Sequence, residues 1–157
     1  MNKKTVYFGA GWFNKDQETA YNDAYQALCQ NDTVDVERSY FPRQNQFHGL
    51  EVADRPELLT DREWSTGTYR GDINGIKTRD MVLAVYLPQD EDPGLAMEIG
   101  WAAATGKHVL MVIPDEYYGE PINLMTWGGS DNVIRMSELA EYDFNTPKFD
   151  FYQGGVY

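Results

Sequence analysis

The sequence predicts an α/β fold with one doubly wound parallel sheet flanked by helices. Residues 78–115 carry the first observation, because RDMVLAVYLP, QDEDPGLAMEIGWAAATG and KHVLMVIPD read as strand, loop with helix, and strand. The second observation is that strand and helix patterns alternate along the rest of the chain. The third is length: 157 residues without an internal repeat or linker predict a single domain, 1–157.

The central elements have the clearest signals. Residues 81–86 form a continuous apolar run, as expected for a strand buried on both faces of a parallel sheet. Pro93 is expected to begin a helix, and Gly106 suits the C-terminal end of that helix. The alternation is that of the flavodoxin-like folds, in which ligands bind at the carboxyl ends of the strands.

Shorter signals predict the N-terminal elements. Residues 5–8 are expected to form the first strand. Asn14 and Gln17 resemble a capping box that opens a helix reaching about residue 30. Residues 34–41 are expected to form a second strand that ends at Pro42, and the polar residues that follow are loop-like.

A long helix is predicted to begin at Pro56, with apolar residues at three- and four-residue intervals. Gly71 and Gly75 indicate that this helix is already ending near Asp72, so that the Asp72 carboxylate reaches a cleft. A small strand is expected near Val133.

Composition excludes several classes of partner. The net charge is −12, from 25 acidic and 13 basic side chains, which disfavours nucleic acids, anionic membranes and polyphosphate substrates. Residues 1–4 lead directly into a strand rather than a signal peptide, and no run approaches the ~20 apolar residues of a membrane helix. The lone cysteine, Cys29, is expected to be a buried structural thiol. These features fit a cytoplasmic protein.

Glu98 is the main candidate for chemistry. It lies within the predicted helix on an otherwise apolar surface, where a carboxylate costs free energy unless something pairs or uses it. Asp92 precedes that helix, and its side chain is expected to cap the helix, to bind a ligand, or to do both. Tyr7 is either a core tyrosine or a hydroxyl donor to a nearby carboxylate, and Asp72 either faces solvent or reaches the cleft.

Other motifs argue against cofactors. The segment FGAGWFN starts like a dinucleotide fingerprint, but Asn14 replaces the third glycine, and Trp12 and Phe13 would crowd a pyrophosphate. NAD(P) is therefore rejected, and the two aromatic side chains suit either stacking on a flat uncharged ring or core packing. Residues 90–92 are interpreted as a solvated acidic loop rather than a magnesium site.

Metal and acyl-transfer chemistry also lack support. His48 and His108 have no partners at metal-ligand spacing, so no metal and no cofactor are predicted. No GxSxG elbow or Cys–His arrangement is present. The remaining carboxylates, tyrosines and amide suit chemistry at an acetal-like carbon, where one carboxylate attacks and a second acid protonates the leaving group.

Several segments resemble the nucleoside 2-deoxyribosyltransferases of lactobacilli, most closely the type II members that accept purines and pyrimidines. They are GAGWF near the start, DINGIKTRD at 72–80, DEDPGLAMEIG at 90–100, VIPDEYYGEPINLMTWG at 112–128, and the terminal FDFYQGGVY. The similarity runs essentially from end to end. The DxGxxxE helix by itself also fits the wider superfamily, which includes deoxynucleoside-monophosphate glycosidases.

The resemblance implies transfer of a 2-deoxyribosyl group between nucleobases, through a covalent glycosyl-enzyme, in nucleotide salvage. It implies that Glu98 is the nucleophile, that Asp72 shuttles a proton to and from the base, and that Tyr7 hydrogen-bonds the nucleophile. No cofactor is implied, and the partners are deoxynucleosides and free bases.

The resemblance also implies how substrates are held. Asp92 and Asn123 match residues that hold the sugar hydroxyls, and the carboxylate of Tyr157 matches a group that joins the site. The residues that match the family's base pocket are Phe13, Gln46 and Met125. The family supplies Asn123 and Met125 across a subunit interface of a homo-hexamer.

Three other functions remain open. One is an N-glycosidase that hydrolyses deoxynucleosides or their monophosphates on the same scaffold, although a cluster of phosphate donors is missing from the sequence. Another is a non-catalytic module that binds nucleosides without turnover. The third is an FMN carrier of the flavodoxin-like class.

Overall fold

The computed structural model describes residues 2–157 and contains a sheet of four parallel strands in the order β1-β2-β3-β4. The strands are β1 (Val6–Gly9), β2 (Met81–Val85), β3 (His108–Ile113) and β4 (Asn132–Arg135). Two isolated parallel bridges flank the free edge of β1: Tyr40 pairs with Tyr7 of β1, and Val34 pairs with Lys4 just before the strand. The chain therefore reverses its direction of winding next to β1, and the predicted doubly wound parallel sheet is confirmed.

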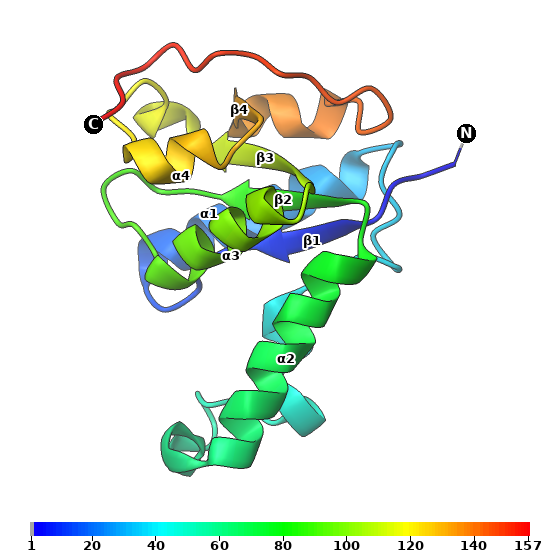
Figure 1. Ribbon diagram of the computed structural model, residues 1–157, viewed down its shortest axis with the longest axis vertical. Helices are drawn as coiled ribbons and strands as arrows, with labels where there is room; N and C mark the ends of the chain where they lie inside the picture. The colour runs from blue at the N-terminus through cyan, green and yellow to red at the C-terminus, as the bar shows by residue number, and fades with distance from the viewer. Residues whose placement is uncertain (1) are drawn as a thin grey trace.

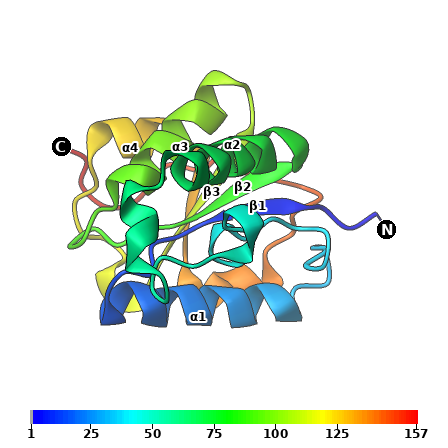
Figure 2. The same cartoon turned by 90° about the horizontal axis from the view of Figure 1, so that it is seen from below.

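Helices cover both faces of this sheet (Figures 1 and 2). The helix α1 (Lys15–Gln30) lies on one face, and α2 (Arg62–Thr78), α3 (Pro93–Ala104) and the short α4 (Leu124–Gly128) lie on the other. Short 3-10 turns complete the fold: η1 (Pro42–Gln44), η2 (Phe47–Gly49), η3 (Pro56–Thr60), η4 (Asp115–Tyr117) and η5 (Met136–Glu141). The helix α2 extends away from the sheet, with η2 and η3 packed beside it (Figure 1).

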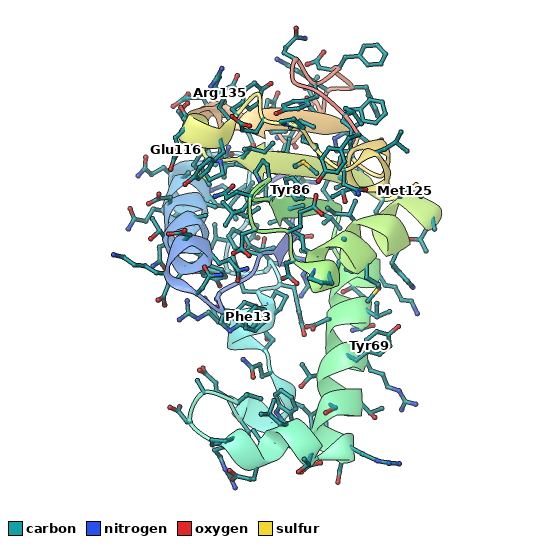
Figure 3. All side chains as sticks on the ribbon, turned by 90° about the vertical axis from the view of Figure 1, so that its left-hand side faces the viewer. Phe13, Tyr69, Tyr86, Glu116, Met125 and Arg135 are labelled. Atoms are coloured by element: carbon teal, nitrogen blue, oxygen red, sulfur yellow. The ribbon has the colours of Figure 1, made fainter. Side chains whose placement is uncertain are left out.

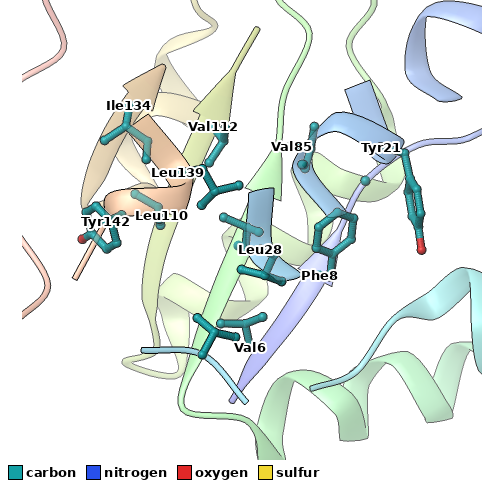
Figure 4. Close-up of a cluster of buried hydrophobic side chains, with 14 of the residues drawn as sticks. Val6, Phe8, Tyr21, Leu28, Val85, Leu110, Val112, Ile134, Leu139 and Tyr142 are labelled. Atoms are coloured by element: carbon teal, nitrogen blue, oxygen red, sulfur yellow. The ribbon is translucent and has the colours of Figure 1, made fainter. Parts of the chain in front are cut away.

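Successive strand residues point to opposite faces, so the core divides into two clusters. Phe8 packs with Tyr21 and Leu28 on the α1 side of the sheet (Figure 4). Tyr7 packs on the other side, in a cluster that includes Ile76 of α2 and Ile99 of α3. Alternation along β1 therefore turns Tyr7 toward the two helices that carry Asp72 and Glu98.

Local signals at the helix ends are confirmed in most cases. The side chain of Asn14 accepts a hydrogen bond from the backbone N–H of Gln17 at 2.9 Å and caps α1. The second half of the predicted capping box is different. In a capping box the Gln17 side chain would accept from the backbone N–H of Asn14, but here it accepts from the N–H of Phe13 at 3.0 Å. Gly106 follows α3 with φ of +75°, which a glycine adopts at low cost.

Three sequence-based expectations about these elements are wrong. Residues 34–41 do not form a continuous strand, because residues 36–38 turn and only the two isolated bridges join this segment to β1. The helix predicted from Pro56 is broken at Asp61, whose extended backbone ends η3 and whose side chain caps α2 at Trp64 N. Gly71 and Gly75 do not end α2, which continues to Thr78.

Cys29 is exposed, so its interpretation as a buried thiol is also wrong. It lies near the C-terminus of α1, while that helix packs on the sheet through Ala20, Ala24 and Leu28. No helix within residues 2–157 combines the length and apolar character needed to cross a bilayer.

Candidate active site

A cleft of about 610 Å³ opens at the carboxyl end of β1, where the reversal of winding predicts ligand binding. Its walls come from the turn after β1, from residues 42–59, from α2 and from the start of α3. Five residues expected to form the site line this cleft: Phe13, Gln46, Asp72, Asp92 and Glu98. Residues far apart in sequence are therefore brought to one cavity.

Glu98 lies on α3 and faces the end of β1. The hydroxyl of Tyr7, a fully buried side chain, donates a hydrogen bond of 2.7 Å to Glu98 Oε1. Gly9 makes this approach possible, because a Cβ there would lie 3.0 Å from Glu98 Oε2 and 2.8 Å from Leu95 Cδ1. Among residues 2–157, no basic side chain forms an ion pair with Glu98.

Burial and neighbouring charge control the proton on Glu98. Burial raises the pKa of Glu98 to about 8; the hydrogen bond from Tyr7 opposes this increase, and the negative charges of Asp72 and Asp92 add to it. Burial likewise raises the pKa of Asp72 to about 6, against a hydrogen bond from Tyr40. The two carboxyl groups therefore hold about one proton between them near neutral pH.

Tyr40 is a residue of this site that the sequence analysis does not predict. Its hydroxyl donates to Asp72 Oδ1 at 3.2 Å, and its ring stacks on that of Tyr7 with centroids 5.6 Å apart. The ring lies directly against α2, since a Cβ at Gly75 would be 2.6 Å from Tyr40 Cδ1. Two glycines one helical turn apart, at 71 and 75, were the available signal, and they indicate a close contact rather than a helix end.

The loop before α3 is more ordered than a solvated acidic loop. Asp90 Oδ2 accepts hydrogen bonds from Asn14 Nδ2 at 2.7 Å and from Gln17 Nε2 at 3.0 Å, which joins this loop to the start of α1. The hydroxyl of Tyr86 donates to Glu91. Asp92 then caps α3 by accepting from Gly94 N at 2.8 Å while it lines the cleft. These bonds fix the position of Asp92.

The two aromatic residues after β1 play different roles. Their rings stack with centroids 5.0 Å apart, but Trp12 is half-buried against Tyr21 and the core. Phe13 is 72% exposed and lines the cleft. Trp12 therefore packs against the core and also lines the cleft, whereas the ring of Phe13 is exposed and free to stack on a ligand.

Asn123, Met125 and Tyr157 do not line the cleft of their own chain. Asn123 caps α4 by accepting from Met125 N at 2.9 Å, and the backbone oxygen of Tyr157 accepts from Leu124 N at 2.7 Å. Met125 and Tyr157 are 78% and 65% exposed, and Met125 lies well away from Phe13 (Figure 3). These residues form a separate exposed surface, named here the α4 surface, which comprises Asn123, Leu124, Met125 and Tyr157.

No group of three or more His, Cys, Asp or Glu side chains among residues 2–157 is arranged to hold a metal ion. Two carboxylates of the cleft, Glu98 and Asp72, are instead paired with tyrosine hydroxyls. A half-buried carboxylate beside a second carboxyl group of raised pKa is an arrangement that can carry out proton transfer and nucleophilic attack.

Comparisons with known proteins agree with this chemistry. Residues 6–125 match the family described as nucleoside 2-deoxyribosyltransferase. The chain is 58% identical to the nucleoside deoxyribosyltransferase of Lactobacillus leichmannii over 157 residues, which is 100% of both chains. It is 57% identical to that of Lactobacillus johnsonii over 148 residues, covering 94% of this chain and 99% of the relative.

A solved structure of a 2-deoxyribosyltransferase from Bacillus psychrosaccharolyticus superposes with a TM-score of 0.77 at 25% identity. That superposition covers 94% of this chain and 98% of the other. The match of sequence and fold along nearly the whole length shows that this chain is an enzyme and belongs to the nucleoside 2-deoxyribosyltransferase family.

Proposed function

We propose that this enzyme exchanges purine and pyrimidine bases on 2-deoxyribose by a double displacement in which Glu98 is the nucleophile. The observation that carries the proposal is the environment of Glu98. Its carboxylate is largely buried, receives a hydrogen bond from Tyr7, has no cationic partner among the described residues 2–157, and lines a cleft that also contains Asp72. The names of the relatives support the same reaction.

In the first displacement, Glu98 attacks the anomeric carbon of a deoxynucleoside. A bond forms between its carboxylate oxygen and that carbon, and the bond to the base nitrogen breaks with its electron pair passing to the base. Asp72, in its protonated form, gives its proton to the departing base. The transition state resembles an oxocarbenium ion, and the negative charge of Glu98 stabilises it.

In the second displacement, a nitrogen of another base attacks the anomeric carbon of the glycosyl-Glu98 ester. Asp72, now ionised, accepts the proton that this nitrogen loses, and Glu98 leaves as a carboxylate. Two inversions give net retention at the sugar. Because Asp72 must both give and take a proton, a pKa of about 6 is close to what this exchange requires.

The rest of the cleft supports binding of a neutral nucleoside. We assign Asp92 to a sugar hydroxyl, since its carboxylate is fixed at the start of α3. Phe13 and Gln46 are assigned to the base, because both line the cleft and one offers an exposed ring while the other offers an amide. The net charge of −12 favours neutral deoxynucleosides over nucleotides and suits salvage in the cytoplasm.

We further propose that a neighbouring subunit of a homo-hexamer completes the site. Asn123, Met125 and Tyr157 match substrate-binding positions of the family, yet within one chain they lie outside the cleft on the exposed α4 surface. A second copy that buries the α4 surface would present these side chains to the adjoining cleft. Closing the cleft would also exclude water, which favours transfer to a base over hydrolysis.

The test is exchange of thymine for adenine on deoxyribose, followed by chromatography. Glu98→Ala should reduce exchange at least about a thousand-fold, because the covalent route is lost. Glu37→Ala, at an exposed glutamate that does not line the cleft, is the control. Mass spectrometry of acid-quenched wild-type protein with deoxynucleoside should find a deoxyribosylated Glu98 peptide. Near-normal exchange by Glu98→Ala would end the proposal.

The same assay tests the rival N-glycosidase. Hydrolysis of a nucleoside monophosphate would need cationic groups at the cleft. In the part of the chain that the structure describes, the one basic residue lining the cleft is Arg43, which already pairs with Glu18 at 2.8 Å. Base release should therefore be slow without an acceptor base and fast with one. Equal rates under both conditions would favour the glycosidase, and binding without turnover would favour a nucleoside-binding module.

A further inference from the structure

The backbone of Tyr40 is fixed beside that of Tyr7 at the edge of the sheet. Tyr40 N donates to Val6 O at 2.9 Å, and Phe8 N donates to Tyr40 O at 2.8 Å. These two bonds form the parallel bridge between Tyr7 and Tyr40, so both side chains leave the sheet on the same face. The sheet itself thus sets the stacking of their rings, which are inclined by 9°.

The two stacked rings carry two matching hydrogen bonds. Tyr7 donates to Glu98 Oε1 on α3, and Tyr40 donates to Asp72 Oδ1 on α2. Burial and the nearby Asp72 carboxylate raise the pKa of Tyr40 well above its usual range. Its hydroxyl therefore remains a donor throughout the pH range in which Asp72 titrates.

The helix α2 is shaped to receive the Tyr40 ring. A Cβ at Gly75 would lie 2.6 Å from the ring, and a Cβ at Gly71 would lie 3.0 Å from the hydroxyl oxygen. The guanidinium of Arg79 lies 5.9 Å from the ring centroid. Two helix-interior glycines cost stability relative to alanine, so their presence here is explained by the close approach they allow.

We propose that Tyr40 is the positioning residue of the proton-transfer group: it holds Asp72 Oδ1 and thereby leaves Oδ2 directed to the nucleobase. The inference rests on the proposed function, because it concerns the carboxyl that protonates the departing base. Tyr40 itself does not line the cleft, whereas Asp72 does. No other hydrogen bond to the Asp72 carboxylate is found among residues 2–157.

The same bond limits how far burial raises the pKa of Asp72. The ionisable groups that face Asp72 are Tyr7 of β1, Tyr40 of the edge segment and Glu98 of α3. On the opposite wall, Arg43 and Glu51 line the cleft. Of these groups, Tyr40 is the one that donates a hydrogen bond to Asp72. Removal of the Tyr40 hydroxyl should therefore raise the pKa of Asp72.

The first test compares Tyr40→Phe with Tyr69→Phe, which removes an exposed hydroxyl from the same helix that carries Asp72. In Tyr40→Phe, the acidic limb of the kcat/KM profile for base exchange should shift upward by about half to one pH unit. The carbon-13 carboxyl resonance of Asp72 should titrate with the same shift, independently of turnover. Tyr69→Phe should reproduce the wild-type limb and the wild-type resonance.

A second variant keeps the hydroxyl but displaces it. Gly71→Ala places a methyl group 3.0 Å from the Tyr40 oxygen, while raising the helix propensity of α2, so it should fold and shift the limb in the same direction. Gly100→Ala is the matched control, because a Cβ there would meet no atom of residues 2–157 within 4 Å apart from its chain neighbours and the nearby backbone of its own helix. If Tyr40→Phe fails to fold, the comparison of Gly71→Ala with Gly100→Ala decides whether the Tyr40 hydroxyl controls the pKa of Asp72.

An unchanged Asp72 titration in folded Tyr40→Phe, or an equal shift in Tyr69→Phe, would overturn the role of Tyr40. Failure of the proposed function gives a different result. Wild-type protein would then exchange no base at any pH, and the Asp72 resonance would still report whether Tyr40 controls that carboxyl.

Discussion

Replacing Glu98 with glutamine should stabilise the protein, and the gain should grow as pH rises. In the folded chain, burial raises the pKa of Glu98 from 4.5 to about 8. A carboxyl group with a raised pKa binds its proton more tightly when folded than when unfolded. The folded state therefore loses stability as pH increases from 4.5 through 8, and a neutral amide at this position avoids that loss.

The size of the gain follows from the same pKa values. Each pKa unit corresponds to about 1.4 kcal/mol, so the stability difference between Glu98→Gln and wild type rises from about 1 kcal/mol at pH 5 to at most about 5 kcal/mol at pH 9. Because water enters the open cleft, we expect roughly half of that upper bound. The amide oxygen can still accept the hydrogen bond from Tyr7, which keeps the local packing comparable.

Urea denaturation at pH 5, 7 and 9 measures this difference. Protein concentration must stay fixed, since dissociation of subunits contributes to the apparent stability of an oligomer. Glu37→Gln, at an exposed glutamate outside the cleft, should show little change with pH. A Glu98→Gln difference that stays constant from pH 5 to 9 would refute the claim that burial holds a proton on Glu98.

Further predictions concern activity. Base exchange should have a bell-shaped pH profile with limbs near pH 6 and pH 8. Below the acidic limb both carboxyl groups are protonated and the nucleophile is lost, and above the basic limb both are ionised and the acid is lost. Initial rates from pH 5 to 9 check this profile. Tyr7→Phe should raise the pKa of Glu98 and move the basic limb upward, with a rate at pH 7 lower by about ten-fold. Gly9→Ala should lower kcat by about a hundred-fold, because the new Cβ displaces Glu98. The melting temperature should fall only slightly. Met125→Asp should weaken self-association in sedimentation and lower exchange together, and an unchanged sedimentation profile would argue against a role of the α4 surface.

The sequence predicted the sheet and the main helices because their signals are local. The apolar run of β2 and the Pro93 and Gly106 boundaries of α3 each depend on neighbours within a few residues. Glu98 was also predictable, since a carboxylate on an apolar helix surface is costly wherever that helix packs.

The wrong expectation about Gly71 and Gly75 arose because these glycines contact a residue that is distant in the sequence. Gly71 and Gly75 favour a helix end when only local propensity is considered, but they accommodate Tyr40, which lies more than thirty residues earlier in the chain. The bonds from Tyr40 to Asp72 and from Tyr7 to Glu98 likewise join segments with no shared sequence pattern. The family resemblance implies the bond from Tyr7 to Glu98, whereas the pair of Tyr40 and Asp72 becomes apparent only after the order of the strands is known.

The property that made Glu98 recognisable also explains how it would react. Removing water from a carboxylate raises its pKa, which costs stability, but it also removes the solvation that weakens the ionised form as a nucleophile. The hydrogen bond from Tyr7 partly offsets this cost, so that the ionised form remains accessible near neutral pH. A charged partner such as lysine would lower the pKa further, yet it would also hold the carboxylate away from the sugar. With each carboxyl paired to a tyrosine hydroxyl, the shared proton can pass from Glu98 to Asp72, and Glu98 would attack in the fraction of molecules in which Asp72 carries that proton.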